Sequence, residues 1–186
     1  MLLVAGLGNP GPKYAGNRHN VGFMVVERLA ERWGVGGFRE KFKGRFAKGT
    51  FADEDVVLLE PLTYMNLSGE SVQKALAFFK VGLGELLVVH DELDLPFGEL
   101  RIKVGGGTAG HNGLRSIVGQ CGGNGFTRVR VGIGRPRSGS VEGYVLSDFS
   151  RDEQATLPDL VERAAQMVEA VVEKGPRGAM NALHRK

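Results

Sequence analysis

The sequence predicts an α/β fold: a single-domain, three-layer sandwich in which helices flank a twisted, mixed and largely parallel β-sheet. Short apolar runs bounded by glycine alternate along the chain with segments whose apolar residues recur every three or four positions. The length of 186 residues suits one hydrophobic core. No internal repeat or low-complexity linker divides the chain, so residues 1–186 are expected to form one domain with a basic C-terminal segment at 175–186.

The N-terminal half contains alternating strand and helix signals. Residues 2–6 are a short apolar run stopped by glycine, which predicts a buried strand. Apolar residues four positions apart predict a helix over about 20–33. Residues 44–50 and 55–60 are expected to form paired strands, and the apolar spacing over 72–79 predicts a second helix.

The C-terminal half continues this alternation. Strands are expected at 86–90, 99–104 and 127–133, with a short helix after Asn112 between the last two. A long amphipathic helix follows and is expected to stop at Gly175–Pro176, because glycine and proline both end helices. A last basic amphipathic segment completes the chain.

The composition restricts the class of protein. One cysteine excludes an internal disulfide and a cysteine-based zinc site, and it favours a reducing, cytoplasmic compartment. No apolar stretch approaches the roughly 20 residues that a membrane helix needs, so no membrane association is expected. The first residues lack a basic leader, which argues against a signal peptide.

The basic residues are clustered. Residues 32–48 hold six basic residues and one acidic residue, and residues 101–137 hold seven basic residues and no acidic one. The alternative is that these are ordinary solvated faces. A polyanionic partner explains them better, because phosphate neutralisation rewards clustered Arg and Lys.

Glycine is abundant, with 29 residues where about 13 are expected from average usage. Both turns and close approach of the backbone to a ligand account for such glycines. The run Gly6–Gly11 fits the G-x-G-x-x-G pattern of dinucleotide-binding proteins, but two prolines prevent a helix from opening directly at the loop. Nicotinamide and flavin are therefore not expected.

Other common site chemistries find little support. The sequence His90–Asp94 contains metal-ligand residue types, but adjacent strand residues point to opposite faces of a sheet. Neither a metal nor another cofactor is expected. Cys121 has only glycines and a glutamine near it, which argues against a nucleophilic cysteine.

Four histidines are present. His19 stands at the start of the first predicted helix, where the helix N-terminus disfavours an imidazolium and keeps the ring neutral; a surface position is the alternative. His90 is expected to be a satisfied core residue, and His184 to be solvated. His111 lies in a glycine-rich loop, where contact with a phosphate or ribose is expected.

Polar residues follow several of the predicted strands. They are Asn9, Tyr64-Met65-Asn66, Asp91 and His111-Asn112. In open α/β sheets ligands bind outside the carboxyl ends of the strands, so these side chains and His19 are expected to converge at one sheet edge. Helix capping by Asn66 or Ser68, and by Asn112, is the alternative.

The motifs resemble those of the bacterial peptidyl-tRNA hydrolase family. The resemblance covers residues 2–136 in family order, and the segment beyond 175 matches less closely. The blocks are Leu7-Gly8-Asn9-Pro10-Gly11 with Tyr14, Arg18-His19-Asn20-Val21-Gly22, Thr63–Gly69, His90–Pro96, Gly110–Leu114 and Arg128–Pro136.

The resemblance implies hydrolysis of the ester that joins a peptide to the 3′ ribose of tRNA, without metal or cofactor. The implied substrates are peptidyl-tRNAs that drop off the ribosome or remain on a stalled large subunit, and the implied state is a monomer. It implies His19 as the general base, Asp91 as its orienting partner, and Asn112 and Asn66 as holders of the water or oxyanion.

The resemblance also assigns binding roles. Asn9 would bind the peptide amide beside the ester, and Tyr14, Tyr64 and Met65 would line the pocket for the terminal nucleotide and peptide. Lys103 and Arg130 would grip the acceptor-end phosphate. The alternative function is a catalytically inactive tRNA- or RNA-binding protein on the same fold, which has no need for both His19 and Asp91.

Overall fold

The computed structural model describes residues 1–183, and the expectation for His184 lies outside that range. Seven strands, five α-helices and four short 3₁₀ turns make up the described residues. The strands are β1 (Leu2–Gly6), β2 (Arg39–Lys41), β3 (Gly44–Phe51), β4 (Glu54–Pro61), β5 (Leu86–Glu92), β6 (Leu100–Val104) and β7 (Thr127–Gly132). The helices are α1 (Val21–Arg32), α2 (Ser68–Phe79), α3 (Asn112–Cys121), α4 (Val141–Val145) and α5 (Arg151–Leu183).

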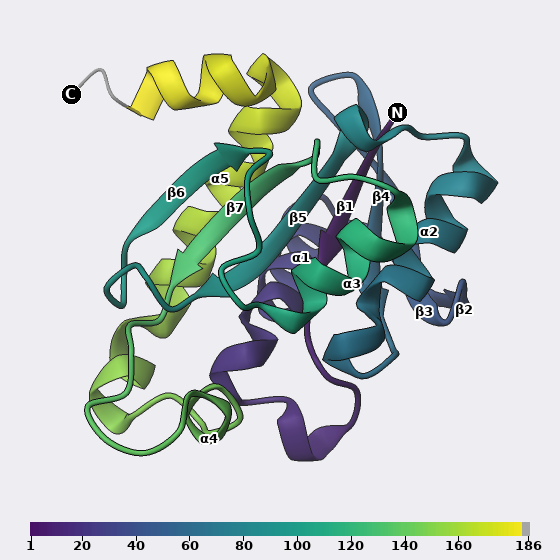
Figure 1. Ribbon diagram of the computed structural model, residues 1–186. Coiled ribbons are helices and arrows are strands. Elements are labelled where there is room, and N and C mark those ends of the chain that lie inside the picture. The colour runs from purple at the N-terminus through teal and green to yellow at the C-terminus, as the bar shows by residue number, and fades with distance from the viewer. Residues whose placement is uncertain (184–186) are drawn as a thin grey trace.

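The strands form one mixed sheet in the order β2-β3-β4-β1-β5-β7-β6 (Figure 1). The pairs β4–β1, β1–β5 and β5–β7 are parallel, whereas β3 and β6 run antiparallel to their neighbours. Five strands therefore share one direction, which confirms the predicted largely parallel sheet. The carboxyl ends of β1, β4 and β5 meet at one edge, where the sequence predicts a site.

Helices cover the sheet in two layers. Alternate strand residues point to opposite faces, so Val4 packs with α1 and α5, and Leu3 and Ala5 pack with α2 and α3. The core is thus divided into two apolar clusters by the sheet itself. Within residues 1–183 the layer of α2 and α3 does not extend over β6 and β7, so no helix lies on the same face of these two strands (Figure 1).

Two glycines let α1 approach the end of β1. A Cβ on Gly6 would lie 2.2 Å from the carbonyl oxygen of Gly22, and one on Gly22 would lie 2.4 Å from the amide nitrogen of Leu7. No side chain fits between these segments. Glycine here serves close backbone contact, and the contact fixes the start of α1 against the site edge of the sheet.

The predicted helix caps are wrong. Neither Asn66 nor Ser68 caps α2. Asn66 lies within a 3₁₀ turn, the Ser68 hydroxyl donates to the carbonyl of Met65 at 2.7 Å, and the Gly69 amide donates instead to the hydroxyl of Ser116 at 2.8 Å. Asn112 is the first residue of α3, and the ring of His111 caps that helix instead. Both asparagines are thereby released from capping.

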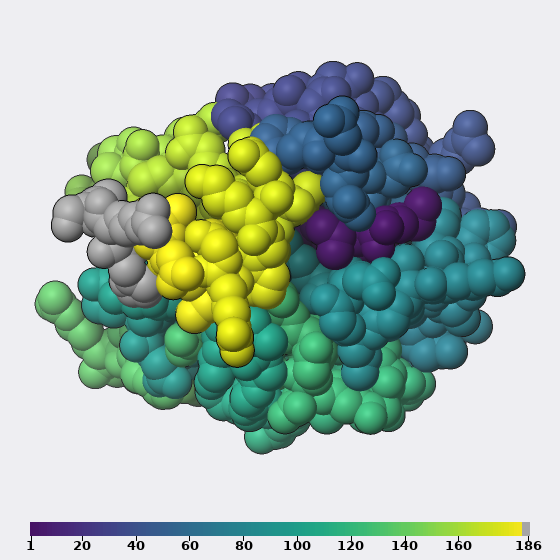
Figure 2. All heavy atoms as spheres, turned by 90° about the horizontal axis from the view of Figure 1, so that it is seen from above, coloured from purple at the N-terminus to yellow at the C-terminus, as the bar shows by residue number. Residues whose placement is uncertain are grey.

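The C-terminal helix bends where the sequence predicts a stop. Gly175 has φ 74° and ψ 168°, which is not helical, and the helix resumes beyond it to Leu183. Met180 from this second part packs against the core. Figure 2 displays the segment in yellow at the surface, close to the purple N-terminus, and Leu2 and Pro176 line the same hollow.

The sequence analysis missed the short strand β2 and the short helix α4, because neither element is long enough to show a hydrophobic period. The helices of residues 1–183 include none with the length and apolar content to cross a membrane.

Candidate active site

A cleft of about 410 Å³ opens at the carboxyl ends of the central strands. It brings together most of the side chains that the sequence predicts for a site. They are Asn9, His19, Tyr64, Met65, Asn66, Asp91, His111 and Asn112. Tyr14 stands at the rim, where its ring meets the edge of Tyr64 with 6.5 Å between centroids.

One wall of the cleft was missed by the sequence analysis. Val141, Glu142, Val145 and Leu146, from α4 and the residue after it, line this wall. Their segment follows a glycine- and serine-rich stretch and carries no motif, so only tertiary structure reveals its place.

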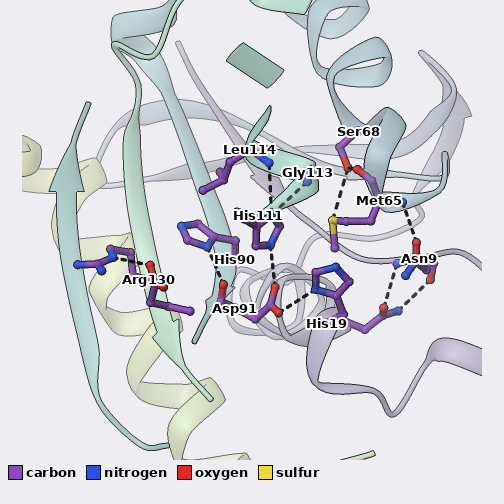
Figure 3. A network of polar contacts seen from close by, with 12 residues as sticks. Asn9, His19, Met65, Ser68, His90, Asp91, His111, Gly113, Leu114 and Arg130 are labelled. Atoms are coloured by element: carbon purple, nitrogen blue, oxygen red, sulfur yellow. Dashed lines mark hydrogen bonds and ion pairs between the residues drawn. The ribbon is translucent and has the colours of Figure 1, made fainter. Parts of the chain in front are cut away.

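Asp91 lies between two histidines (Figure 3). Its Oδ2 is 2.8 Å from Nδ1 of His19, and its Oδ1 is 2.8 Å from Nε2 of His111. The residue is only 3% exposed, so the carboxylate faces the two rings rather than solvent. Both of its oxygens are therefore committed to holding imidazoles.

The backbone of α3 determines which nitrogen of His111 carries the proton. The amides of Gly113 and Leu114 donate to Nδ1 of His111 at 3.1 and 3.3 Å. Because Nδ1 accepts, the proton of the neutral ring sits on Nε2, which donates to Asp91. Both ring nitrogens are thus engaged inside the protein, which leaves the ring face and carbon edges of His111 for any substrate contact.

The same logic assigns the proton of His19. Asp91 accepts at Nδ1 of His19, so the neutral ring carries its proton there and keeps a lone pair on Nε2. This is the tautomer that a general base needs. His19 and Asp91 lie side by side in the cleft, as the sequence analysis requires.

Charge at Asp91 shifts the pKa values of the site. Burial lowers the pKa of His19, but the charge of Asp91 and its hydrogen bond outweigh burial and raise it above the ordinary value. The expectation that neighbours keep His19 uncharged is therefore wrong in direction. Burial raises the pKa of Asp91, but the two histidines outweigh it and hold that pKa well below its usual range.

His90 is buried but not fully satisfied. Its Nδ1 donates to the carbonyl of Asp91 at 2.8 Å, whereas Nε2 has no hydrogen-bond partner among residues 1–183. Burial, reinforced by the neighbouring His111, lowers the pKa of His90 to about 3. The ring stays neutral and packs edge-on against His111, 5.1 Å between centroids.

A pair of asparagines fixes the orientation of Asn9. The Asn9 amide donates to Oδ1 of Asn20, and Nδ2 of Asn20 donates back to the Asn9 carbonyl, each at 2.9 Å. The Met65 amide donates to Oδ1 of Asn9 at 2.7 Å. This bond orients the side-chain amide of Asn9, whose NH₂ group is left as a donor for the cleft. The sequence analysis missed Asn20, whose role is to hold this loop.

A buried arginine ties the segment of His19 to the cleft wall. Arg18 donates to the hydroxyl of Ser147 at 2.6 Å and to Glu153 at 2.8 Å. Its guanidinium also lies 4.0 Å from the ring centroid of Tyr144. Arg18 therefore connects the turn before α1 to the residues that follow α4.

Replacing Arg18 by methionine is expected to lower the free energy of unfolding by about 2–4 kcal/mol, because Glu153 loses its partner while partly buried. Thermal denaturation should show a fall in Tm of roughly 5–15 °C. Arg163→Met is the control: that arginine is exposed, and its loss should cost less than about 0.5 kcal/mol. Equal Tm values for the two variants would contradict this role.

The two residues predicted to bind the acceptor-end phosphate lie outside the cleft, on the uncovered face of β6 and β7. Lys103 stands opposite Arg128, and Arg130 donates to Glu92 at 2.9 Å. Arg128 is not available to a ligand. It is 2% exposed and donates to the carbonyls of Gly106 and Gly107, so part of the basic block is structural.

Three potential metal ligands meet in the cleft, although the sequence shows no His/Asp cluster at a recognisable metal-ligand spacing. Ligand atoms of His19, Asp91 and His111 all lie within 4.8 Å of one another. The hydrogen bonds among them account for this grouping, and the absence of a metal requirement stays a prediction.

Cys121 does not line the cleft, and burial raises the pKa of its thiol to about 11.

The fold and the cleft together define an α/β protein whose buried histidine–aspartate pair is arranged for proton transfer. A family model described as peptidyl-tRNA hydrolase matches residues 3–186. The chain therefore belongs to the peptidyl-tRNA hydrolase family, an enzyme family of the hydrolase class, and the predicted resemblance is confirmed.

Individual relatives agree with this assignment. The peptidyl-tRNA hydrolase of Sorangium cellulosum is 56% identical over 97% of this chain and 82% of its own length. That of Geobacter sulfurreducens is 50% identical, over 99% and 95%. A crystal structure of the Acinetobacter baumannii peptidyl-tRNA hydrolase superposes with a TM-score of 0.91 at 41% identity, covering 100% of this chain and 95% of that one.

Proposed function

We propose that this chain hydrolyses the ester between peptide and tRNA by general-base attack of water, with His19 as the base. The activity is that of its family, and nothing in the comparisons favours the alternative of an inactive RNA-binding protein. The observation that carries the mechanism is the tautomer of His19, which Asp91 sets at 2.8 Å and which leaves Nε2 able to take a proton.

The reaction needs two proton transfers. Nε2 of His19 takes a proton from a water molecule as the water oxygen bonds to the ester carbonyl carbon, which moves the C=O electron pair onto oxygen. When the carbonyl re-forms, the bond to the ribose 3′ oxygen breaks and that oxygen takes the proton from His19. The products are a peptide with a free carboxyl group and a tRNA with a free 3′ end.

Asp91 and His111 are positioning residues in this scheme. Asp91 keeps the proton of His19 on Nδ1 and stabilises the imidazolium that forms during attack. His111 donates to the other oxygen of Asp91, and α3 fixes its orientation in turn. Asn66 and Asn112, both exposed in the cleft, supply neutral amide donors to the water or the oxyanion.

Asn9 is the residue we assign to peptide recognition. Because the Met65 amide occupies its Oδ1, Asn9 offers donors to a peptide carbonyl. A free α-ammonium presents only N–H groups, which cannot accept from the NH₂ group of Asn9, so unblocked aminoacyl-tRNA is disfavoured. Tyr14, Tyr64 and Met65 form the apolar surround for the terminal nucleotide and the peptide.

We assign the grip on the acceptor-end phosphate to Lys103 and Arg130. Both sit on the face of β6 and β7 that no helix within residues 1–183 covers, and Arg130 contacts Glu92 of the cleft lining. We further propose that the protein acts as a cytoplasmic monomer of one domain. Its substrates are peptidyl-tRNAs released from ribosomes or held on stalled large ribosomal subunits.

Removing these two charges is expected to weaken substrate binding. Lys103→Gln and Arg130→Gln should each raise KM by roughly tenfold with kcat little changed, because the phosphate contact precedes chemistry. The slope of log KM against log salt should flatten by about 1 for each variant. A salt slope equal to that of the wild type would contradict the phosphate role.

The activity itself is tested by the release of deacylated tRNA from an N-acetyl-aminoacyl-tRNA, run beside the unblocked aminoacyl-tRNA. Rapid release from the blocked substrate alone is expected. Equal rates on both substrates would remove Asn9 from specificity, and release from neither would overturn the assignment.

A further inference from the structure

We propose that a basic surface at the β2–β3 edge of the sheet is a second contact site for RNA, separate from the catalytic cleft and from the β6–β7 face. We call it the hairpin patch and define it as Lys41, Lys43, Lys48, Lys74 and Phe78. Three of its lysines, Lys41, Lys43 and Lys48, belong to the first basic block of the sequence, which the hydrolase mechanism does not use, and Lys74 and Phe78 come from α2.

The patch is contiguous across three elements. Nζ of Lys41 lies 3.9 Å from the ring centroid of Phe78. Lys74 precedes Phe78 by four residues on α2, so the two share one helix face. On that face Glu70, a further turn back, pairs with Lys43 at 2.7 Å.

The turn between β2 and β3 is held in a fixed shape. Phe42 and Lys43 have φ of 62° and 51°, a region that non-glycine residues rarely adopt. Phe42 anchors the turn by packing against Phe78 and Phe79, with 5.0 and 5.5 Å between centroids. Lys41 and Lys43 are thus presented from a rigid hairpin rather than a loose loop.

The positive charge of the patch is largely uncompensated. Other members of the same basic block are neutralised, since Arg32 pairs with Glu162 and Glu169. Lys41, Lys48 and Lys74, by contrast, have no carboxylate partner within residues 1–183. Glu70 offsets only Lys43.

The composition of the patch favours RNA over a protein partner. Lysine is depleted at protein–protein interfaces, whose centres are apolar. Here the exposed apolar component is the ring of Phe78, which is 55% exposed among lysines. Proteins bind single-stranded RNA through basic side chains that contact the phosphates and aromatic rings that stack on the bases.

The patch is too distant to share a phosphate with the β6–β7 face. Strands β2 and β6 are the two outer strands of the sheet, six strand spacings apart, or about 29 Å (Figure 1). The RNA at the patch is therefore a different segment from the acceptor end. The hairpin turn nevertheless borders the site edge, because the Leu62 amide donates to the carbonyl of Lys43 at 2.9 Å.

The test measures binding of a fluorescein-labelled, 12-nucleotide single-stranded RNA by fluorescence anisotropy. Excess unlabelled deacylated acceptor minihelix is present, so that the β6–β7 face is occupied. The test variant is Lys41→Gln/Lys43→Gln/Lys74→Gln. The control removes three exposed charges elsewhere, from α5: Arg151→Gln/Arg163→Gln/Lys174→Gln.

The patch variant should bind the oligonucleotide at least tenfold more weakly than the control at about 0.1 M salt. Its plot of log affinity against log salt should flatten by about 2, as three phosphate contacts to a single strand are lost. Phe78→Leu should weaken binding about fivefold or more through lost stacking. Hydrolysis of a peptidyl minihelix should stay within twofold of wild type, which separates this proposal from the catalytic one.

Three results would overturn the proposal. The first is an affinity and salt slope equal to those of the α5 control. The second is a raised KM for the peptidyl minihelix, which would make the patch part of the substrate site. The third is a patch variant that no longer binds a polyglutamate peptide but still binds the oligonucleotide, which would indicate an acidic protein partner.

Discussion

Replacement of His19 by alanine is expected to lower kcat by about 10²–10⁴, the usual range for the loss of a general base. No other side chain in the cleft combines a free imidazole lone pair with a carboxylate partner, among the residues that the structure describes. His111 has both nitrogens engaged, and His90 is buried with its pKa lowered to about 3. The affinity for a non-hydrolysable substrate analogue should change little.

Single-turnover hydrolysis of N-acetyl-aminoacyl-tRNA measures this effect free of product release. His19→Asn, which keeps a polar side chain of similar size, should be impaired to a similar degree. A folded His19→Ala variant that retains more than a tenth of the wild-type rate would remove His19 from the mechanism.

Asp91→Asn is expected to lower kcat by about 10²–10⁴ without unfolding the protein. The amides of Gly113 and Leu114 fix the proton of His111 on Nε2, so the Oδ1 of the new asparagine must face His111. Its NH₂ group then donates to Nδ1 of His19, which forces the proton of that ring onto Nε2. A base with its proton on the wrong nitrogen cannot accept one from water; in serine proteases the corresponding change costs about 10⁴.

The matched control is Asp94→Asn, three residues along the same segment. Asp94 is about half exposed and pairs with Arg135 outside the cleft, so its loss should leave kcat within twofold of wild type. Equal activity of the two variants would show that the carboxylate of Asp91 has no special role.

The pKa shifts also predict how the pair contributes to stability. The raised pKa of His19 means that folding favours its charged form, so this contribution is full at low pH and is lost as pH rises through the folded pKa. The lowered pKa of Asp91 means that folding favours its ionised form. This stabilisation is full above the unfolded pKa of aspartate and is lost as pH falls through the folded pKa. The pair therefore stabilises the fold most at mildly acidic pH, where His19 is protonated and inactive.

The sequence predicts the location of the site well because parallel strands end at one edge. Asn9 follows β1, Met65 follows β4, and Asp91 stands near the end of β5, so topology alone brings them together. His19 joins them because Gly6 and Gly22 allow α1 to approach β1 closely. The alternative role of Asn66 and Asn112 was helix capping, and neither of them caps a helix by its side chain.

The details that the sequence could not supply depend on long-range contacts. The tautomer of His19 depends on Asp91, which lies 72 positions away in the chain, and Arg18 reaches residues more than 120 positions away. The sign of the His19 pKa shift was wrong because a helix N-terminus was weighed without the adjacent carboxylate. Residue patterns report local periodicity, whereas these properties arise only when distant segments pack.

The basic blocks show the same limit. Arg128 and Arg130 are adjacent in the alternating pattern of β7, yet one is buried under the glycine loop and the other faces Glu92 near the cleft. Arg45, in the first block, is held by Glu27 and Glu60. A count of charges along the chain therefore overstates the number that are free to meet RNA.

The central claim is that His19, in the tautomer set by Asp91, takes the proton from water. The most direct test compares the acid limb of the kcat/KM pH profile with the titration of His19 followed by NMR in the free enzyme. We predict one shared pKa in both, above the ordinary histidine value of about 6.5, with activity rising as the ring loses its proton. A rate that does not fall while His19 becomes protonated would contradict the account.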